Sequence, residues 1–213
     1  RNHSSAASDV YKRQGEEAFN WLGGEYTSNA SVEGLENIPK DGKFLIVSNH
    51  PMGAADAIAL YHQIYPVRND LFFFANELFV YLLGAFHELL APVVWNKEKE
   101  THSASKVTLE RLSVFFGDDR PGIIFPSGRL SKLTFLGLWD RPWEKTPIAL
   151  AKKYNFPLIP VYVEGRNSWF FYFASYVNKQ LRDISQLNEL FNKRGKEISL
   201  SLIHISEPTR HRR

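Results

Sequence analysis

Residues 44–56 read FLIVSNHPMGAAD, and this stretch decides the fold. Its first four residues are apolar, as in a buried strand, and the proline and glycine that follow predict a rigid turn. The turn projects His50 out of the sheet, and a helix is expected over 54–64. Asp56 comes six positions after His50 and lies within its reach if the turn leads into that helix. The stretch therefore predicts a strand, a turn and a helix that bring an imidazole and a carboxylate together.

The alternation of apolar runs and longer helical patterns continues along the chain. Strands are expected at 43–48, 71–74, 92–95, 122–125 and 157–164, with a further strand starting at 196–199. Helices are expected at 16–22, 54–64, 77–90, 101–116, 146–154 and 177–193. Such alternation indicates a single α/β domain, with a mixed, mostly parallel sheet flanked by helices. Gly23-Gly24 is expected to end the first helix, and Pro160 predicts that its strand lies near an edge or carries a bulge.

The two ends of the chain are expected to be foreign to the natural protein. Residues 4–14 are what one reading frame of a common transposase-type sequencing adapter would encode, and residues 200–210 look like its opposite strand, translated. We therefore expect 1–14 and 200–213 to be read-through and 15–199 to be the natural domain, truncated at both ends. A signal peptide or an anchoring helix upstream of Gly15 could then have been lost.

Charge and composition exclude several classes of function. Without the six basic and two acidic residues of the ends, the 26 basic and 23 acidic residues fall to 20 and 21. The pI near 9 is therefore no indication of a nucleic-acid partner. Cysteine is absent, which excludes disulfides, thiolate metal sites and a cysteine nucleophile.

Aromatic residues are unusually many, at 14% of the chain with sixteen Phe and five Trp. This composition fits a globular core together with some surface that meets lipid or an acyl chain. Polar residues interrupt the stretch 71–95, which falls short of the ~20 apolar residues that a spanning helix needs.

His50 and Asp56 are the candidate catalytic pair. An imidazole beside a carboxylate is suited to act as a general base, because the carboxylate fixes the ring tautomer and stabilises the protonated ring. The alternative is a structural histidine with an ordinary first-turn carboxylate that the helix dipole favours. A metal site of His50, Asp56 and His62 is disfavoured, since its spacings of six and six differ from those of helical zinc motifs.

A second candidate loop, FPSGR at 125–129, follows the strand expected at 122–125. Ser127 has no glycine two places before or after it, so the loop does not match the nucleophile elbow of serine hydrolases. Gly128 allows close backbone approach, and Arg129 is suited to pair with phosphate. A tight turn that carries a solvated arginine is the alternative.

Three blocks in order make the chain similar to the glycerolipid acyltransferase superfamily, which includes the glycerol-3-phosphate and lysophosphatidic acid acyltransferases. They are Asn49-His50 with Asp56, the loop at 125–129, and IPVYV at 159–163. The Asn-His-Pro turn with its glycine, together with GRNSWFFY at 165–172, resembles the bacterial haemolysin-like and ornithine-lipid acyltransferase branch. The resemblance covers most of residues 34–199. It implies that 71–90 and 169–176 line an acyl tunnel or face a bilayer, with plain core packing as the alternative for any one side chain.

The resemblance implies acyl transfer from a thioester of acyl carrier protein or coenzyme A to a hydroxyl of a lysolipid or glycerol-phosphate-type acceptor. His50 would take the hydroxyl proton, and Asp56 would orient and charge-stabilise the ring. No metal or redox cofactor and no nucleic acid is implied. The expected partner is a membrane surface, the cytoplasmic face of a bacterial inner membrane, with the protein peripheral or anchored by a missing segment. The candidate substrate-binding residues are Asn49, Gly53, Lys97, Ser127, Gly128, Arg129 and Arg166.

The chain departs from the family pattern at three places. Five residues separate His50 from Asp56 where the superfamily usually has four, which fits the branch named above. Ser127 replaces the glutamate of the usual Phe-Pro-Glu-Gly-Thr-Arg loop, and Arg129 falls one place early. Lys97 stands where an arginine usually follows an apolar strand. Two alternatives stay open: a non-catalytic lipid-binding homologue, and a hydrolase that passes the acyl group to water with the same base.

Overall fold

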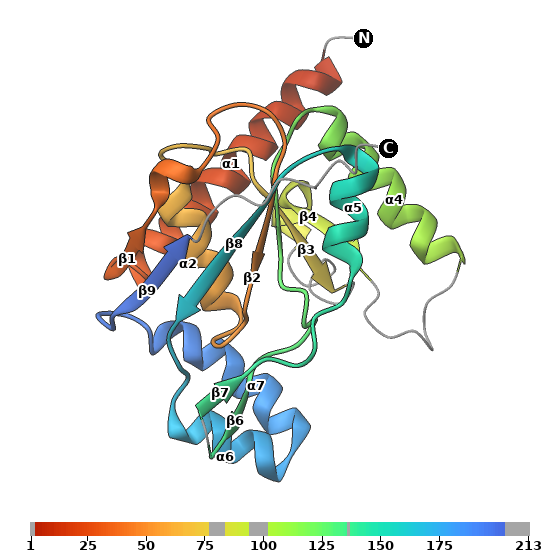
Figure 1. Cartoon of the computed structure of the whole chain (residues 1–213). Coiled ribbons are helices and arrows are strands. Elements are labelled where there is room, and N and C mark those ends of the chain that lie inside the picture. The colour runs from red at the N-terminus through yellow and green to blue at the C-terminus, as the bar shows by residue number, and fades with distance from the viewer. Residues whose placement is uncertain (1–2, 77–83, 94–101, 136, 203–213) are drawn as a thin grey trace.

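The computed structural model describes residues 3–76, 84–93, 102–135 and 137–202 (Figure 1). Seven strands form one sheet in the order β1-β9-β8-β2-β5-β3-β4, in which β8 and β9 are antiparallel and every other pair is parallel. This confirms the expected α/β fold with a mixed, mostly parallel sheet. In that order the strands are Ala30–Glu33, Ile198–Leu202, Leu158–Glu164, Leu45–Ser48, Gly122–Ile124, Phe72–Asn76 and Leu90–Val93.

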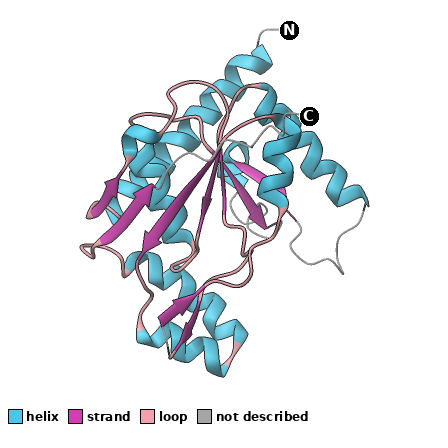
Figure 2. Cartoon of the chain, viewed as in Figure 1, coloured by secondary structure: helices cyan, strands magenta, loops and turns pink. Residues whose placement is uncertain are grey.

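Helices cover both faces of the sheet, as Figure 2 shows. They are α1 (His3–Tyr26), α2 (Ala54–Ile64), α4 (His102–Gly117), α5 (Thr146–Tyr154), α6 (Trp169–Val177) and α7 (Lys179–Phe191), with 3-10 turns η1 (Leu35–Asn37) and η2 (Gly84–Leu89). A small hairpin of β6 (Lys132–Thr134) and β7 (Gly137–Trp139) lies apart from the main sheet. Among the described residues, no helix is both long enough and apolar enough to cross a membrane.

Successive side chains of the central strands enter two different cores, because a strand points alternate residues to opposite faces. Ile46, Phe73 and Ile123 pack with residues of α1 and α2. Leu45 and Val47, together with their neighbours Phe72, Phe74 and Ile124, pack with residues of α4 and α5. Burial on both faces explains why these strands read as unbroken apolar runs.

Glycine at the end of the first helix proved misleading. The structure continues α1 through Gly23-Gly24 to Tyr26, so the expected stop is wrong. A Cβ atom at Gly23 would overlap the Cβ of His62 on α2. The glycine therefore permits close packing of the two helices instead of ending one of them.

Pro160 lies inside the sheet and not at its edge, because β8 stands between β9 and β2. The described antiparallel register with β9 runs from Val161 to Glu164, so Pro160 lies one residue outside it. On its other side Pro160 is opposite Val47 in the parallel register with β2. A missing N–H is tolerated where the neighbouring ladder ends.

Two expected helices have different limits in the structure. Of the stretch 77–90, residues 77–83 lie outside the described part, while Gly84–Leu89 is a 3-10 turn and Leu90 begins β4. The helix expected over 177–193 starts at Lys179, because Asn178 is extended and caps it by accepting a 2.6 Å hydrogen bond from Gln180 N. At the chain ends, α1 begins at His3 and β9 reaches Leu202, so both extend past 15–199; that the ends are read-through stays a prediction.

Candidate active site

The His50 turn lies at the carboxyl end of β2, in the middle of the sheet. Figure 1 shows β2, β8 and β3 pointing toward the same end of the molecule, where α6, α7 and the β6–β7 hairpin gather. The carboxyl ends of the strands are where open α/β sheets form their ligand sites. The fold thus delivers the candidate pair to the edge at which a substrate is expected.

His50 and Asp56 meet as the sequence predicts, with 3.0 Å between His50 Nδ1 and Asp56 Oδ2. Asp56 is completely buried, in the first turn of α2. Its Oδ2 atom also accepts backbone hydrogen bonds from Met52 N (2.9 Å) and Gly53 N (3.0 Å). A helix N-terminus and two N–H donors stabilise the carboxylate, and the turn that carries the imidazole is closed on it.

The pair is close but is not aligned as a hydrogen bond. His50 Nδ1 meets no acceptor in hydrogen-bond geometry within the described residues, and the buried Asp56 Oδ1 atom has no partner there either. The 3.0 Å between Nδ1 and Oδ2 is already a hydrogen-bond distance, so the angle is what departs from a hydrogen bond. Tightening of such a contact in the substrate complex is common for catalytic hydrogen bonds.

Phe125 stacks on the imidazole, with 4.0 Å between the ring centroids and 23° between the planes. This contact brings the second loop beside the pair. The loop is a tight turn in which Gly128, at φ +60°, donates to Phe125 O at 2.9 Å, and Ser127 Oγ donates to Arg129 O at 2.7 Å. Arg129 itself is exposed, so its binding role stays a prediction.

Asn49 fixes the turn to the neighbouring strand. Its side chain donates to Val163 O at 2.8 Å and accepts from Val163 N at 2.7 Å. The described contacts of Asn49 are therefore positioning contacts, and the substrate-binding role expected for it stays a prediction. These side-chain bonds lie just beyond the last pair of the β2–β8 register, Ser48 with Val161, and set the backbone just before His50.

Asp140 holds the other side of the turn and was missed by the sequence analysis. Its Oδ1 atom accepts from His50 N at 3.3 Å and from the Ser131 hydroxyl, and its Oδ2 atom accepts from Trp143 Nε1 at 2.9 Å. Ser131 N in turn donates to His50 O at 2.9 Å. Asp140 is 90 residues from His50, so no local motif reveals this contact.

Gly53 is required by both conformation and space. Its φ of +81° and ψ of −128° belong to a region that L side chains rarely adopt. A Cβ atom would lie 2.6 Å from Gln186 Nε2 on α7 and 3.0 Å from Leu130 Cδ2. The His50 turn is thus enclosed by α7 on one side and by the segment leading into the hairpin on another. This gives Gly53 a packing role, and substrate contact by its backbone stays a prediction.

A buried ionic network secures the loop that follows β8. Glu189 accepts from Ser168 N at 2.8 Å and from Ser168 Oγ at 2.5 Å, and it lies 3.3 Å from Lys193 Nζ. Lys193 Nζ also donates to Arg166 O and Asn167 Oδ1, both at 2.8 Å. Neither Glu189 nor Lys193 was predicted from the sequence as part of the site.

Burial and pairing shift both ionisable groups of this network. Burial raises the pKa of Glu189, but the hydrogen bonds from Ser168 and the charge of Lys193 lower it by more, so the net shift of this pKa is downward. Burial lowers the pKa of Lys193, and Glu189 opposes this. The loop that this network holds packs against the His50 turn, since a Cβ atom at Gly165 would lie 2.5 Å from the sulfur of Met52.

The remaining candidates are not all part of the assembled site. Lys97 lies outside the described residues. Arg166 has an exposed side chain, and its carbonyl binds Lys193, so a role in binding substrate stays a prediction. His62 Nδ1 lies 2.7 Å from Asn20 Oδ1 on α1. In the described part of the chain, no three His, Asp or Glu side chains converge as metal ligands do.

The comparisons with known proteins agree in finding similarity to acyltransferases. A family-wide sequence model described as "Acyltransferase" matches residues 11–211. Two bacterial proteins named lyso-glycine lipid O-acyltransferase are each 31% identical to the chain over 82% of its length: that of Phocaeicola vulgatus over 182 residues and that of Bacteroides thetaiotaomicron over 181. The chain spans 63% and 64% of these two relatives, less than two thirds of each.

A solved structure has the same fold. The crystal structure of the 1-acyl-sn-glycerophosphate acyltransferase of Thermotoga maritima matches with a TM-score of 0.51 and 22% sequence identity. The match covers 98% of this chain and 73% of that one. At this identity the likeness concerns the fold, including its mostly parallel sheet.

Proposed function

This chain belongs to the glycerolipid acyltransferase superfamily, and on that premise we propose that it transfers a fatty acyl group from an acyl thioester to a hydroxyl of a lysolipid. The donor is acyl carrier protein or coenzyme A. The names of the two bacterial relatives favour a lyso-glycine lipid as the acceptor, ahead of the glycerol-phosphate type. The proposal includes a peripheral position on the cytoplasmic face of a bacterial membrane, where lipid acceptor and soluble donor meet.

In the proposed reaction His50 is the general base. It takes the proton of the acceptor hydroxyl as the oxygen attacks the thioester carbonyl carbon, and the carbon–sulfur bond then breaks. The proton passes to the leaving thiolate, so the products are an ester and a free thiol. Asp56 holds the ring and stabilises its protonated form, as the carboxylate of a triad does, with the substrate hydroxyl in place of a serine. The proposed chemistry needs neither a metal nor a redox cofactor.

One observation carries the proposal: a fully buried carboxylate lies 3.0 Å from the imidazole of His50, at the carboxyl end of the central strand. Burial matters because a carboxylate shielded from water acts more strongly on the imidazolium that forms during the reaction. Phe125 supports the same reading, since it stacks on the ring and keeps the 125–129 loop beside it. Backbone N–H groups of that loop are suited to meet the oxyanion of the tetrahedral intermediate.

The test follows a labelled acyl thioester incubated with the protein, with and without lysolipid. We expect labelled ester and free thiol to appear together and only when the lysolipid is present. His50→Ala should lower the rate by roughly 10²–10⁴, the usual contribution of a general base. The matched control is His87→Ala, a histidine with a 56% exposed side chain on η2, which should react like the unaltered protein.

Three outcomes would contradict the proposal. Ester formation that His50→Ala leaves unchanged would rule out this histidine as the base. Thiol release that does not depend on the lysolipid would favour a hydrolase. A protein that binds lysolipid but releases no thiol with either donor would favour the non-catalytic homologue.

A further inference from the structure

Helix α6 turns an apolar face to the outside of the molecule. Its most exposed side chains are large and uncharged, with exposed fractions from 56% to 91%, and they define the α6 face: Trp169, Phe170, Phe173, Tyr176 and Val177. A helix on the surface of a soluble protein ordinarily carries polar or charged residues there. The exposed stripe is therefore the reverse of what contact with water alone favours.

The α6 face is held outward by contacts on the other side of the helix. Its five residues recur at positions i, i+1, i+4, i+7 and i+8, which a helical repeat gathers into one stripe. Phe171 and Ala174, on the opposite side, are almost completely buried. Ser168 caps the helix by accepting from Phe171 N at 3.2 Å, and Glu189 binds that serine. The exposed stripe is thus a fixed surface.

Neighbouring elements extend the apolar surface. Leu181 and Ile184 of α7 are 50% and 66% exposed, and Phe135, at the tip of the β6–β7 hairpin, is fully exposed. Figures 1 and 2 show α6, α7 and this hairpin together at one end of the molecule. The four aromatic residues of the α6 face alone leave roughly 600 Å² in contact with water, at about 200 Å² each when fully exposed. This is as large as the largest apolar patch on a typical monomer.

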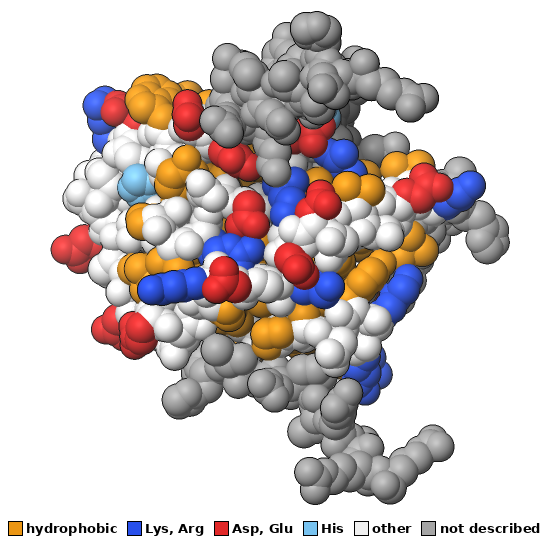
Figure 3. Space-filling model, turned by 90° about the horizontal axis from the view of Figure 1, so that it is seen from above, with side chains coloured by type: hydrophobic (Ala, Val, Ile, Leu, Met, Phe, Trp, Pro, Cys, Tyr) orange, Lys and Arg blue, Asp and Glu red, His pale blue; other side chains and the backbone are white. Residues whose placement is uncertain are grey.

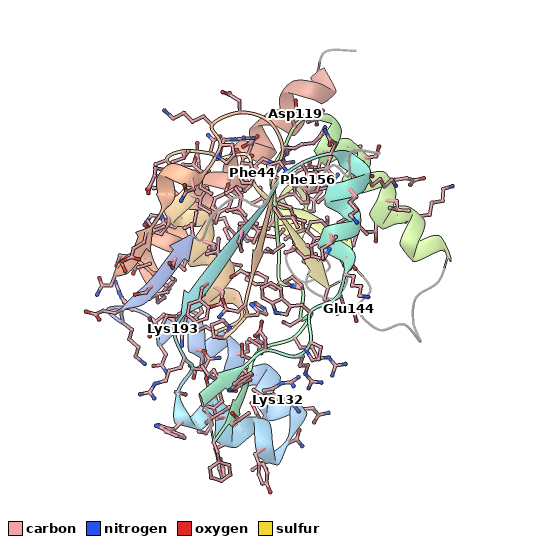
Figure 4. All side chains as sticks on the ribbon, in the orientation of Figure 1. Phe44, Asp119, Lys132, Glu144, Phe156 and Lys193 are labelled. Atoms are coloured by element: carbon pink, nitrogen blue, oxygen red, sulfur yellow. The ribbon has the colours of Figure 1, made fainter. Side chains whose placement is uncertain are left out.

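Basic side chains accompany this surface. Arg166 is exposed three residues before α6, and Arg129 and Lys132 are exposed on the loop and hairpin at the same end of the molecule, where Figure 4 shows Lys132. Of the acidic residues in this part of the chain, Asp140 and Glu189 are bound internally, as described above, whereas Glu144 and Glu164 are exposed. An apolar surface bordered by cations is complementary to an anionic bilayer, whose acyl boundary accepts aromatic rings and whose phosphates attract cations.

The opposite end of the molecule has a different surface. Figure 3, seen from that end, shows Lys and Arg side chains interspersed with Asp and Glu, and apolar side chains in small groups between them. Several of these charges are paired, as Lys43 with Asp119 at 3.4 Å and Arg68 with Asp70 at 2.9 Å. Opposite charges that neutralise one another give no attraction to an anionic surface. The two ends of the molecule along the strand direction therefore differ in surface: one exposes the apolar α6 face, and the other exposes paired charges.

We infer that the α6 face docks the protein on an anionic lipid bilayer. The carboxyl ends of the parallel strands then point toward the membrane, and the His50 turn, enclosed by Leu130 and Gln186, lies just behind the docking surface. A lysolipid hydroxyl would reach the base from the headgroup layer. The inference rests on the proposed function for its choice of a lipid partner, and its test does not depend on activity.

The test measures co-sedimentation of the full chain with vesicles of equal parts phosphatidylglycerol and phosphatidylcholine. We expect binding that Trp169→Ser and Phe173→Ser each weaken about tenfold, because each removes one large apolar side chain from the acyl boundary. The matched control is Trp21→Ser on α1, a tryptophan that is 62% exposed and outside the α6 face; its binding should equal that of the unaltered chain. Lys132→Gln should weaken binding about fivefold on these vesicles and leave binding to pure phosphatidylcholine unchanged.

Other results would overturn the inference. Equal vesicle binding by the α6 variants and the unaltered chain would do so, as would equal weakening by Trp21→Ser. A dimer in gel filtration that Phe173→Ser dissociates without affecting vesicle binding would identify a second copy as the occupant. Vesicle binding that depends on α6, without any acyl transfer, would support the docking surface and contradict the proposed function. Acyl transfer by a protein whose α6 variants bind vesicles normally would support the function and contradict the docking surface.

Discussion

Replacing Glu189 with glutamine is expected to destabilise the protein by about 3 kcal/mol. The side chains of Glu189 and Lys193 are 2% and 1% exposed, so the change leaves a buried ammonium without a counter-charge. Removing one partner of a buried pair typically costs about 3–5 kcal/mol. We expect the lower end of this range, because Lys193 Nζ keeps two acceptors at 2.8 Å, Arg166 O and Asn167 Oδ1, while its distance to the lost carboxylate is 3.3 Å.

The assay is urea unfolding followed by circular dichroism, with thermal unfolding in parallel. A loss of about 3 kcal/mol corresponds to a fall of roughly 6–12 °C in Tm for a chain of this size. Glu144→Gln, which alters an exposed carboxylate, is the control and should change little. Combining Glu189→Gln with Lys193→Met removes the stranded charge and should recover part of the loss. A single variant that loses under about 1 kcal/mol, or a double variant no more stable than the single, would refute this account.

Three further changes have expected outcomes. Because the pKa of Glu189 is lower in the folded than in the unfolded protein, its ionised form stabilises the fold above about pH 4.3, and this stabilisation is lost as pH falls through the folded-state pKa. The free energy of unfolding of Glu189→Gln should therefore fall less steeply with decreasing pH than that of the unaltered chain. Gly23→Ala should cost about 1–3 kcal/mol in urea unfolding, because its Cβ overlaps His62, whereas Gly24→Ala, 3.6 Å from its nearest neighbour, should not. Asp140→Ala should lower kcat and leave KM nearly unchanged in the acyl-transfer assay, since it loosens the backbone of His50, the proposed base; a change in KM alone would contradict this.

The parts of the fold that could be predicted are those that local sequence determines. The limits expected for α2 agree with the structure, because Gly53 starts the helix, Asp56 caps its first turn, and Pro66 follows its end. The meeting of His50 with Asp56 followed from the same short stretch. In each case the interacting groups are a few residues apart in the sequence, so their spacing predicts which of them meet.

What could not be predicted depends on contacts between distant segments. Asp140 reaches His50 across 90 positions, and Glu189 reaches Ser168 across 21, so neither contact has a signature in the spacing. Gly23 was interpreted by its common role at helix ends, but packing of α1 on α2 decided its use. The stretch 169–176 was expected to face an acyl tunnel or a bilayer; four of its aromatic side chains are exposed, whereas Phe171 and Ala174 are core, and the bilayer contact stays a prediction.

The central claim is that the imidazole of His50, oriented by the buried carboxylate of Asp56, removes the proton from a lipid hydroxyl. The most direct measurement is the single-turnover rate of ester formation on lyso-glycine lipid by the full chain and by His50→Ala, with circular dichroism showing that both are folded. The account predicts that the substitution lowers this rate by at least about 100-fold. A folded His50→Ala protein that forms the ester as fast as the unaltered chain would contradict it.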